Sequence, residues 1–144
     1  MSDPASGQPR DRAPRIARCS CGQLQAEVFG APFRVSVCHC LECKRRSGSA
    51  FAWAGRYYAS QVTLSGTRRT FVRVGDEGSR ITFRFCPDCG VTVAYENDDL
   101  PGMIALPAGT FADPGYPAPT VSVYDPARIC AWLDLVTEPP ERWG

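Results

Sequence analysis

The sequence has little net charge, no long apolar run and only one histidine. Its 16 Lys and Arg residues nearly balance 15 Asp and Glu residues, for a formal net charge of +1, which argues against bulk attraction to nucleic acid or an anionic membrane. No apolar run is long enough to span a bilayer. Residues 1–15 contain no apolar stretch like that of a secretory signal, so we expect a cytoplasmic protein with no nucleic-acid or membrane partner. His39 is the only histidine, so no second one can act as a metal ligand.

Cysteine, by contrast, is abundant, and seven of the eight cysteines fall into three tight clusters. Cytosolic thiols are kept reduced, so such cysteines are more often metal ligands or catalysts than disulfides. Thiolates that share one zinc ion must lie within about 4 Å of each other, because each Zn–S bond is about 2.3 Å long. The clustering therefore predicts metal sites. The clusters are Cys19 with Cys21, Cys38 with Cys40 and Cys43, and Cys86 with Cys89.

The length of 144 residues suggests one domain, large enough to bury a real core. Residues 1–15 are rich in Pro, Arg, Asp, Ser and Gly, which predicts a disordered tail. A single zinc-binding β domain is then expected over residues 16–144. The 13 Gly and 13 Pro residues favour many turns and few long helices, so the expected fold class is mainly β, with many short strands.

Turn residues between alternating apolar segments predict three hairpins. They pair residues 24–29 with 33–37, residues 70–74 with 80–85, and residues 80–85 with 91–95 across the turn from Cys86 to Cys89. Further strands are expected at 51–57, 62–64, 103–106 and 120–124. Residues 41–47 predict one helical turn that stops at Gly48. Residues 126–135 predict one short C-terminal helix, with Asp125 as N-cap and proline at its first position.

Two of the cysteine pairs predict one closed metal site. Cys86 and Cys89 flank a turn that Gly90 can close by adopting a positive φ, and backbone N–H groups in such a turn stabilise thiolates. Cys19 and Cys21 are alternate residues, which share one face of an extended chain. Together the pairs supply four thiolates, the usual set of a structural zinc site. The alternative is that either pair is an ordinary buried or redox pair, but the βαβ setting of a Cys-x-x-Cys redox motif is missing.

The remaining cluster, Cys38, Cys40 and Cys43, predicts a second zinc ion with only three protein ligands. An exchangeable fourth position is typical of catalytic zinc, and a thiol bound there loses its proton. His39 could close the site, but in an extended chain it points away from its two cysteine neighbours. Cys130 is the other possible ligand, although its apolar surroundings favour a plain core cysteine.

A cationic segment follows this cluster directly. Its residues are candidates to bind the carboxylates of a small acidic substrate, together with backbone N–H groups; a solvated basic turn is an equally good interpretation. Trp53 is the best candidate to line the pocket. The candidate substrate-binding residues are Lys44, Arg45, Arg46, Ser47 and Trp53.

The ordered cysteine pattern resembles the glutathione-dependent formaldehyde-activating enzyme family, which includes centromere protein V. The matching segments are Cys19-x-Cys21-Gly22, Cys38-His39-Cys40-x-x-Cys43 with Arg45, Ser47 and Gly48, and Phe85-Cys86-x-x-Cys89-Gly90. Pro119 and Trp132 also match, so the similarity runs over residues 16–135.

The resemblance implies a β-tent fold of small antiparallel sheets held by zinc. It implies two zinc ions, one structural and one open to the sulfur of glutathione. It implies a carbon–sulfur lyase that forms or cleaves S-hydroxymethylglutathione from a glutathione-like thiol and a small aldehyde. One departure is that many members carry a histidine near the position of Ser122, which puts a proton-transfer or binding step in doubt. A non-catalytic module that binds zinc or a thiol is the alternative function. The sequence leaves the oligomeric state open.

Overall fold

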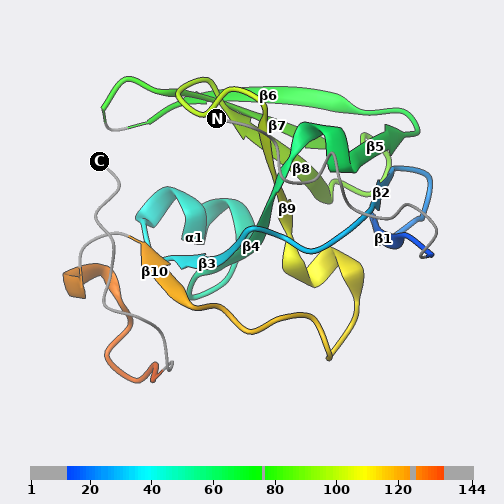
Figure 1. Ribbon diagram of the computed structural model, residues 1–144. Helices are drawn as coiled ribbons and strands as arrows, with labels where there is room; N and C mark the ends of the chain where they lie inside the picture. The colour runs from blue at the N-terminus through cyan, green and yellow to red at the C-terminus, as the bar shows by residue number, and fades with distance from the viewer. Residues whose placement is uncertain (1–12, 76, 124–125, 135–144) are drawn as a thin grey trace.

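The computed structural model describes residues 13–75, 77–123 and 126–134. They form ten strands and one short α-helix (Figure 1). The helix is α1 (Leu41–Ser47). The strands are β1 (Arg15–Arg18), β2 (Gln25–Val28), β3 (Arg34–Cys38), β4 (Ala52–Tyr58), β5 (Val62–Ser65), β6 (Arg69–Val74), β7 (Arg80–Phe85), β8 (Thr92–Asn97), β9 (Met103–Pro107) and β10 (Val121–Val123).

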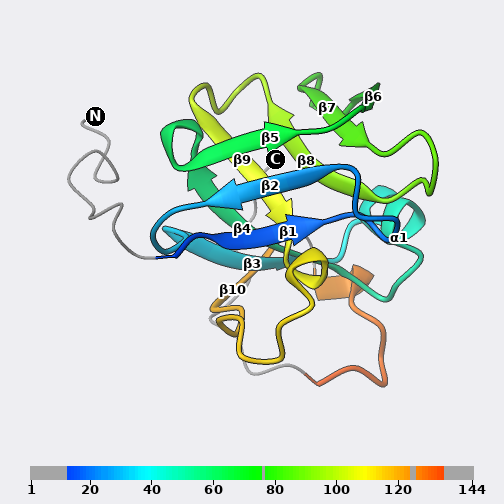
Figure 2. The ribbon, with the colours of Figure 1, turned by 90° about the vertical axis from the view of Figure 1, so that its right-hand side faces the viewer.

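The strands make two sheets. The smaller has the order β1-β2-β5 and the larger the order β10-β3-β4-β9-β8-β7-β6. Figure 2 shows the three-stranded sheet lying in front of the larger one. One apolar core fills the space between them. Its members are Ala17, Leu24, Ala26 and Val28 from the small-sheet side, Tyr57, Val93, Ala94, Ile104 and Leu106 from the large sheet, and the cysteines Cys19 and Cys86.

Two of the three expected hairpins are confirmed. β6 pairs with β7 in an antiparallel register that sets Phe71 opposite Phe83. β7 pairs with β8 across the turn that carries Cys86 and Cys89, with a register shift at Arg84 and Phe85. In both cases a short connection joins strands that are neighbours in sequence, which is the arrangement that local turn chemistry specifies best.

The expected hairpin of residues 24–29 with 33–37 is wrong. β2 pairs with β1 and β5, whereas β3 pairs with β4 and, in parallel, with β10. The loop between β2 and β3 therefore carries the chain from one sheet to the other. The buried Gln61 holds this loop, because its Nε2 atom donates to Phe29 O at 2.9 Å and to Ala31 O at 3.0 Å. The β3–β10 pair also means that the large sheet is mixed rather than purely antiparallel.

The α-helix lies at residues 41–47, and the expected C-terminal helix is wrong. Cys40 caps α1 by accepting a hydrogen bond from Cys43 N–H, and Gly48 ends it with φ 64°. Within the described part of the C-terminal segment, Pro126–Arg128 forms a 3-10 turn. A turn this short does not propagate into an α-helix. Asp125 and Leu135 lie outside the described residues. In the part of the chain that the structure describes, no helix is long and apolar enough to cross a membrane.

The first strand begins at Arg15, within the segment expected to be a tail. Residues 1–12 of that expected tail lie outside the described residues. The expected strands at 51–57, 62–64 and 103–106 correspond to β4, β5 and β9. β10 covers the described part of the strand expected at 120–124.

Candidate metal centres and the adjoining pocket

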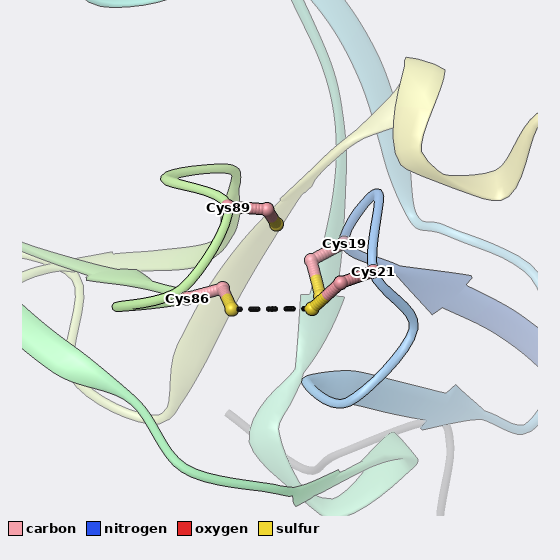
Figure 3. Close-up of side chains that lie close together, drawn as sticks. All are labelled: Cys19, Cys21, Cys86 and Cys89. Atoms are coloured by element: carbon pink, nitrogen blue, oxygen red, sulfur yellow. Dashed lines mark hydrogen bonds between the residues drawn. The ribbon is translucent and has the colours of Figure 1, made fainter.

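The first cysteine cluster joins the two sheets. Cys19 and Cys21 follow β1, and Cys86 and Cys89 lie in the turn between β7 and β8 (Figure 3). All four Sγ atoms lie within 4.8 Å of one another. Cys21 Sγ is 3.6 Å from the sulfur atoms of both Cys19 and Cys86, close to the edge of about 3.8 Å that a tetrahedron with Zn–S bonds of about 2.3 Å requires.

Neighbouring N–H groups point at these sulfur atoms. Leu24 N–H donates to Cys19 Sγ at 3.3 Å, and Asp88 N–H donates to Cys86 Sγ at 3.4 Å. Gln23 Nε2 donates to Cys86 Sγ at 3.0 Å. Burial raises the pKa of Cys86, but the Gln23 and backbone hydrogen bonds outweigh it and lower that pKa to about 6. The cluster is therefore built to hold thiolates, and its donor set fits a structural metal ion.

The second cluster forms where β3 passes into α1. Cys38 is the last residue of β3, Cys40 is the N-cap of α1, and Cys43 lies in the first turn. Their three Sγ atoms lie within 4.8 Å of one another, and Cys43 N–H donates to Cys40 Sγ at 3.2 Å. All eight cysteines are free thiols. Three soft sulfur donors in this arrangement could hold a metal ion, with one tetrahedral position left for another ligand.

The pKa values of the three thiols in this cluster are shifted in different directions. Hydrogen bonds from Cys38 and then from Cys43 lower the pKa of Cys40 to about 2. The reciprocal hydrogen bond with Cys40 raises the pKa of Cys38. The hydrogen bond with Cys38 lowers the pKa of Cys43, but the bond with Cys40, burial and the Cys40 charge outweigh it and raise that pKa to about 11. Cys40 is thus the first of the three to become a thiolate.

Neither alternative fourth ligand joins this cluster, whose members among the described residues are the three cysteines alone. His39 is 2% exposed, and its ring centroid lies 6.0 Å from that of Phe51. Burial, and then the charge of Lys44, lower the pKa of His39. Cys130 Sγ instead lies 3.6 Å from Lys44 Nζ.

The three cationic side chains of α1 make different contacts. Lys44 Nζ donates to the carbonyl oxygen of Arg128. Arg45 is 73% exposed and forms an ion pair with Glu42. Arg46 lies over the rings of Tyr95 and Phe83, with its Cζ atom 5.1 Å and 5.5 Å from their centroids. Its charge favours the thiolate of Cys43.

Arg73 is not among the candidates identified from the sequence, although it adds a second positive charge beside the second cysteine cluster. Its Cζ atom lies 5.6 Å from the Phe83 centroid, and its charge favours the Cys40 thiolate. The signal was the alternation along β6, which sets Phe71 and Arg73 on the face of Phe83 and Ile81. Nothing local indicated that α1 would cover this face.

A cavity of about 770 Å³ lies between the two cysteine clusters. Of the candidate substrate-binding residues, Arg46, Ser47 and Trp53 line it, whereas Lys44 and Arg45 do not. Ser47 Oγ donates to Cys43 O at 2.8 Å. The three cysteines of the second cluster do not line the cavity, but Ala52, which pairs with Cys38, does. The other lining residues are Arg18, Cys19, Ser20, Ser49, Phe51, Gly90, Val91, Thr92, Pro107, Gly109, Thr110 and Ala112.

Ser122 lies away from this cavity. It sits in β10 opposite Val37, is 3% exposed, and its Oγ atom has no hydrogen-bond partner among the described residues. The resemblance leads us to expect a histidine at this position in many relatives. In this chain it is therefore a buried position in the sheet.

Comparisons with known proteins bear on both the family and the fold. A crystal structure of a Rhodobacter sphaeroides protein matches with a TM-score of 0.52 and 19% sequence identity, over 66% of this chain and 85% of that chain. At that identity the match shows the fold alone. No curated protein matches the chain. The family model for glutathione-dependent formaldehyde-activating enzyme matches residues 14–126. Since that match includes both cysteine clusters and all ten strands up to β10, the chain belongs to the glutathione-dependent formaldehyde-activating enzyme family.

Proposed function

We propose that this protein is a zinc-dependent enzyme of the carbon–sulfur lyase type that acts on a glutathione-like thiol and a small aldehyde. Known members of the family condense formaldehyde with glutathione. The observation that carries the proposal is the cluster of Cys38, Cys40 and Cys43, which could supply three of four tetrahedral ligands to a metal ion. Ala52, the strand partner of Cys38, lines the cavity. A site that leaves one position open is typical of catalytic rather than structural zinc.

The two zinc ions would have different roles. Cys19, Cys21, Cys86 and Cys89 would hold the structural ion, which joins the loop after β1 to the β7–β8 turn. Cys38, Cys40 and Cys43 would hold the second ion, which when bound keeps a substrate thiol deprotonated at neutral pH. Arg46 and Arg73 add positive charge beside these cysteines, and so favour their thiolate forms.

The overall reaction is an addition that requires no oxidant. The thiol sulfur forms a bond to the carbonyl carbon, the C=O π bond breaks, and the carbonyl oxygen takes up one proton. Cleavage of S-hydroxymethylglutathione reverses each of these changes. Arg46, Ser47 and Trp53 line the cavity and would orient the thiol, so their contribution is positioning.

A second candidate function is binding of zinc or a thiol without turnover. It is favoured by the lining of the cavity, where the structure places no Asp, Glu, His or Lys among the described residues. His39 and Ser122 are both buried away from it. General acid–base catalysis requires a titratable group within reach of the proton that moves.

Exchange NMR of glutathione and formaldehyde distinguishes the two functions. The zinc-loaded protein should speed adduct formation and cleavage above the spontaneous rates. Cys38→Ser should lose this acceleration and one of two zinc ions, counted by native mass spectrometry. Cys130→Ser is the matched control, because Cys130 belongs to neither cluster, and it should keep both.

The enzyme and the binding module predict different results in these measurements. A glutathione complex that depends on Cys38, with adduct formed no faster than in buffer, would support the binding module and exclude the enzyme. A wild-type protein that carries only one zinc ion would remove the physical basis of both functions.

A further inference from the structure

The cavity between the cysteine clusters has the charge of an anion-binding pocket. Arg18 and Arg46 both line it, and no carboxylate does so in the part of the chain that the structure describes. Among the described residues, the ion pairs are Arg45 with Glu42 and Arg84 with Glu96, so no carboxylate of this part of the chain pairs with either lining arginine. Its volume of about 770 Å³ lies in the usual range for small-molecule sites.

The two arginines are close in sequence to different cysteine clusters. Arg18 ends β1 immediately before Cys19, and its side chain crosses the cysteine loop. Its Nη1 atom lies against Gly22, 2.7 Å from the position that a Cβ atom on that residue would take. Arg46 lies in the last turn of α1, three residues after Cys43. The two cations thus enter one cavity from separate parts of the chain.

Arg46 is also held in place before a ligand binds. Its guanidinium lies over the faces of Tyr95 and Phe83, which restricts its rotation. The buried Nε atom of Arg46 and the buried Nε1 atom of Trp53 have no hydrogen-bond partner among the described residues. Unpaired buried donors are costly, and a ligand carboxylate would supply an acceptor beside them.

We propose that Arg18 and Arg46 each bind a different carboxylate of one thiol substrate. Arg18 is then a specificity-determining residue. The inference rests on the proposed function, since the thiol of the same ligand must reach the second cluster. Ala52 and Arg46 connect the cavity to that cluster, because Ala52 pairs with Cys38 and Arg46 follows Cys43 by three residues in α1.

Calorimetric titration of the zinc-loaded full-length protein tests this assignment. The ligands are glutathione and its monoethyl ester, in which the glycine carboxylate is esterified. Arg18→Gln and Arg46→Gln should each weaken glutathione binding about tenfold or more, because hydrogen bonds to charged groups are the stronger ones. One of the two variants should then bind the ester as the wild type does, since its carboxylate partner is already blocked.

Controls separate binding from folding. Arg80→Gln changes an arginine at the start of β7 that does not line the cavity, and it should bind both ligands as the wild type does. Arg18→Lys keeps the positive charge and should lose less affinity than Arg18→Gln. Native mass spectrometry should find two zinc ions in every variant.

The outcomes for the two proposals differ. Glutathione binding that neither arginine variant weakens would overturn the assignment and leave the proposed function standing. Equal losses for glutathione and the ester in both variants would also overturn it. Arginine-dependent binding without catalysis would uphold the assignment and refute the enzyme. A wild-type protein that binds no glutathione would refute both.

Discussion

At the scale of single residues, one glycine makes room for a buried tyrosine pair. Tyr57 and Tyr116 are 0% and 4% exposed, and their hydroxyl oxygens lie 2.7 Å apart. Gly55 lies on β4 directly beneath the Tyr116 hydroxyl, so that a Cβ atom on it would lie 1.8 Å from that oxygen. Tyr116 also stacks on Phe111 and meets Trp53 edge to face. The glycine therefore determines how one wall of the core is packed.

Gly55→Ala should lower the free energy of unfolding by about 1–3 kcal/mol, because the new methyl group must displace the Tyr116 ring. Urea unfolding measures this difference. Gly109→Ala is the matched control, since a Cβ atom there meets nothing within 4 Å, and it should change the stability by less than about 0.5 kcal/mol. Equal effects of the two substitutions would contradict this explanation of Gly55.

The tyrosine pair also predicts a dependence of stability on pH. Burial, and then the hydrogen bond to Tyr116, raise the pKa of Tyr57 above its ordinary value. Above pH of about 10 the unfolded chain loses the tyrosine proton that the folded chain keeps, so stability should fall as the pH rises further. Tyr57→Phe should make this fall shallower. Urea midpoints at pH 8, 10 and 11 test it, and parallel pH curves for the two proteins would contradict it.

At the scale of elements, Gln61 stabilises the loop between β2 and β3, which connects the two sheets. Its Nε2 atom donates to Phe29 O and Ala31 O, and its Oε1 atom accepts from Tyr58 N–H at 3.0 Å. Side-chain amides suit this task because they donate and accept at once. The loop between β2 and β3 is therefore specified by a residue about thirty positions further along the chain.

Gln61→Glu should destabilise the fold by about 2 kcal/mol at pH 8, because a carboxylate cannot donate to the carbonyl groups of Phe29 and Ala31. Gln25→Glu is the matched control. Gln25 Nε2 makes one hydrogen bond, to Gly22 O at 3.0 Å, so its replacement should cost less than about 1 kcal/mol. Chemical denaturation compares the two, and a larger loss for Gln25→Glu would contradict the role of Gln61.

At the scale of the whole molecule, the two cysteine clusters should contribute unequally to stability. The first links Cys21 to Cys86, which are 65 residues apart, and joins the two sheets. The second spans only Cys38 to Cys43, within one short segment. Because loop-closure entropy grows with the logarithm of loop length, the first link should stabilise the fold by about 2 kcal/mol more than the second.

Cys86→Ser should therefore lower the thermal midpoint more than Cys43→Ser, with each variant losing one zinc ion. Chelator treatment should unfold the wild type at a lower temperature than the zinc-loaded protein, because ligand binding to the folded state is folding free energy. Native mass spectrometry and thermal unfolding together measure both effects. Equal midpoints for the two variants would show that the first cluster is not the main link between the sheets.

Local sequence determined those features whose cause lies within a few residues. The clustered cysteines predicted both metal-binding groups, because ligands that share an ion are most simply supplied by short loops. The β6–β7 and β7–β8 hairpins follow from turns between neighbouring strands. The helical turn at 41–47 follows from a cap at Cys40 and a stop at Gly48.

Tertiary structure alone decided the features that join distant segments. It placed β2 in the smaller sheet, because β1 and β5 offered partners on both of its edges. It turned Arg46 to the cavity while Arg45 turned outward, and it brought Arg18 and Arg73 to the two clusters from other strands. Such contacts depend on which faces pack together. Alternation along a strand shows that a residue shares a face with its neighbours, but only the packed sheets determine what that face contacts.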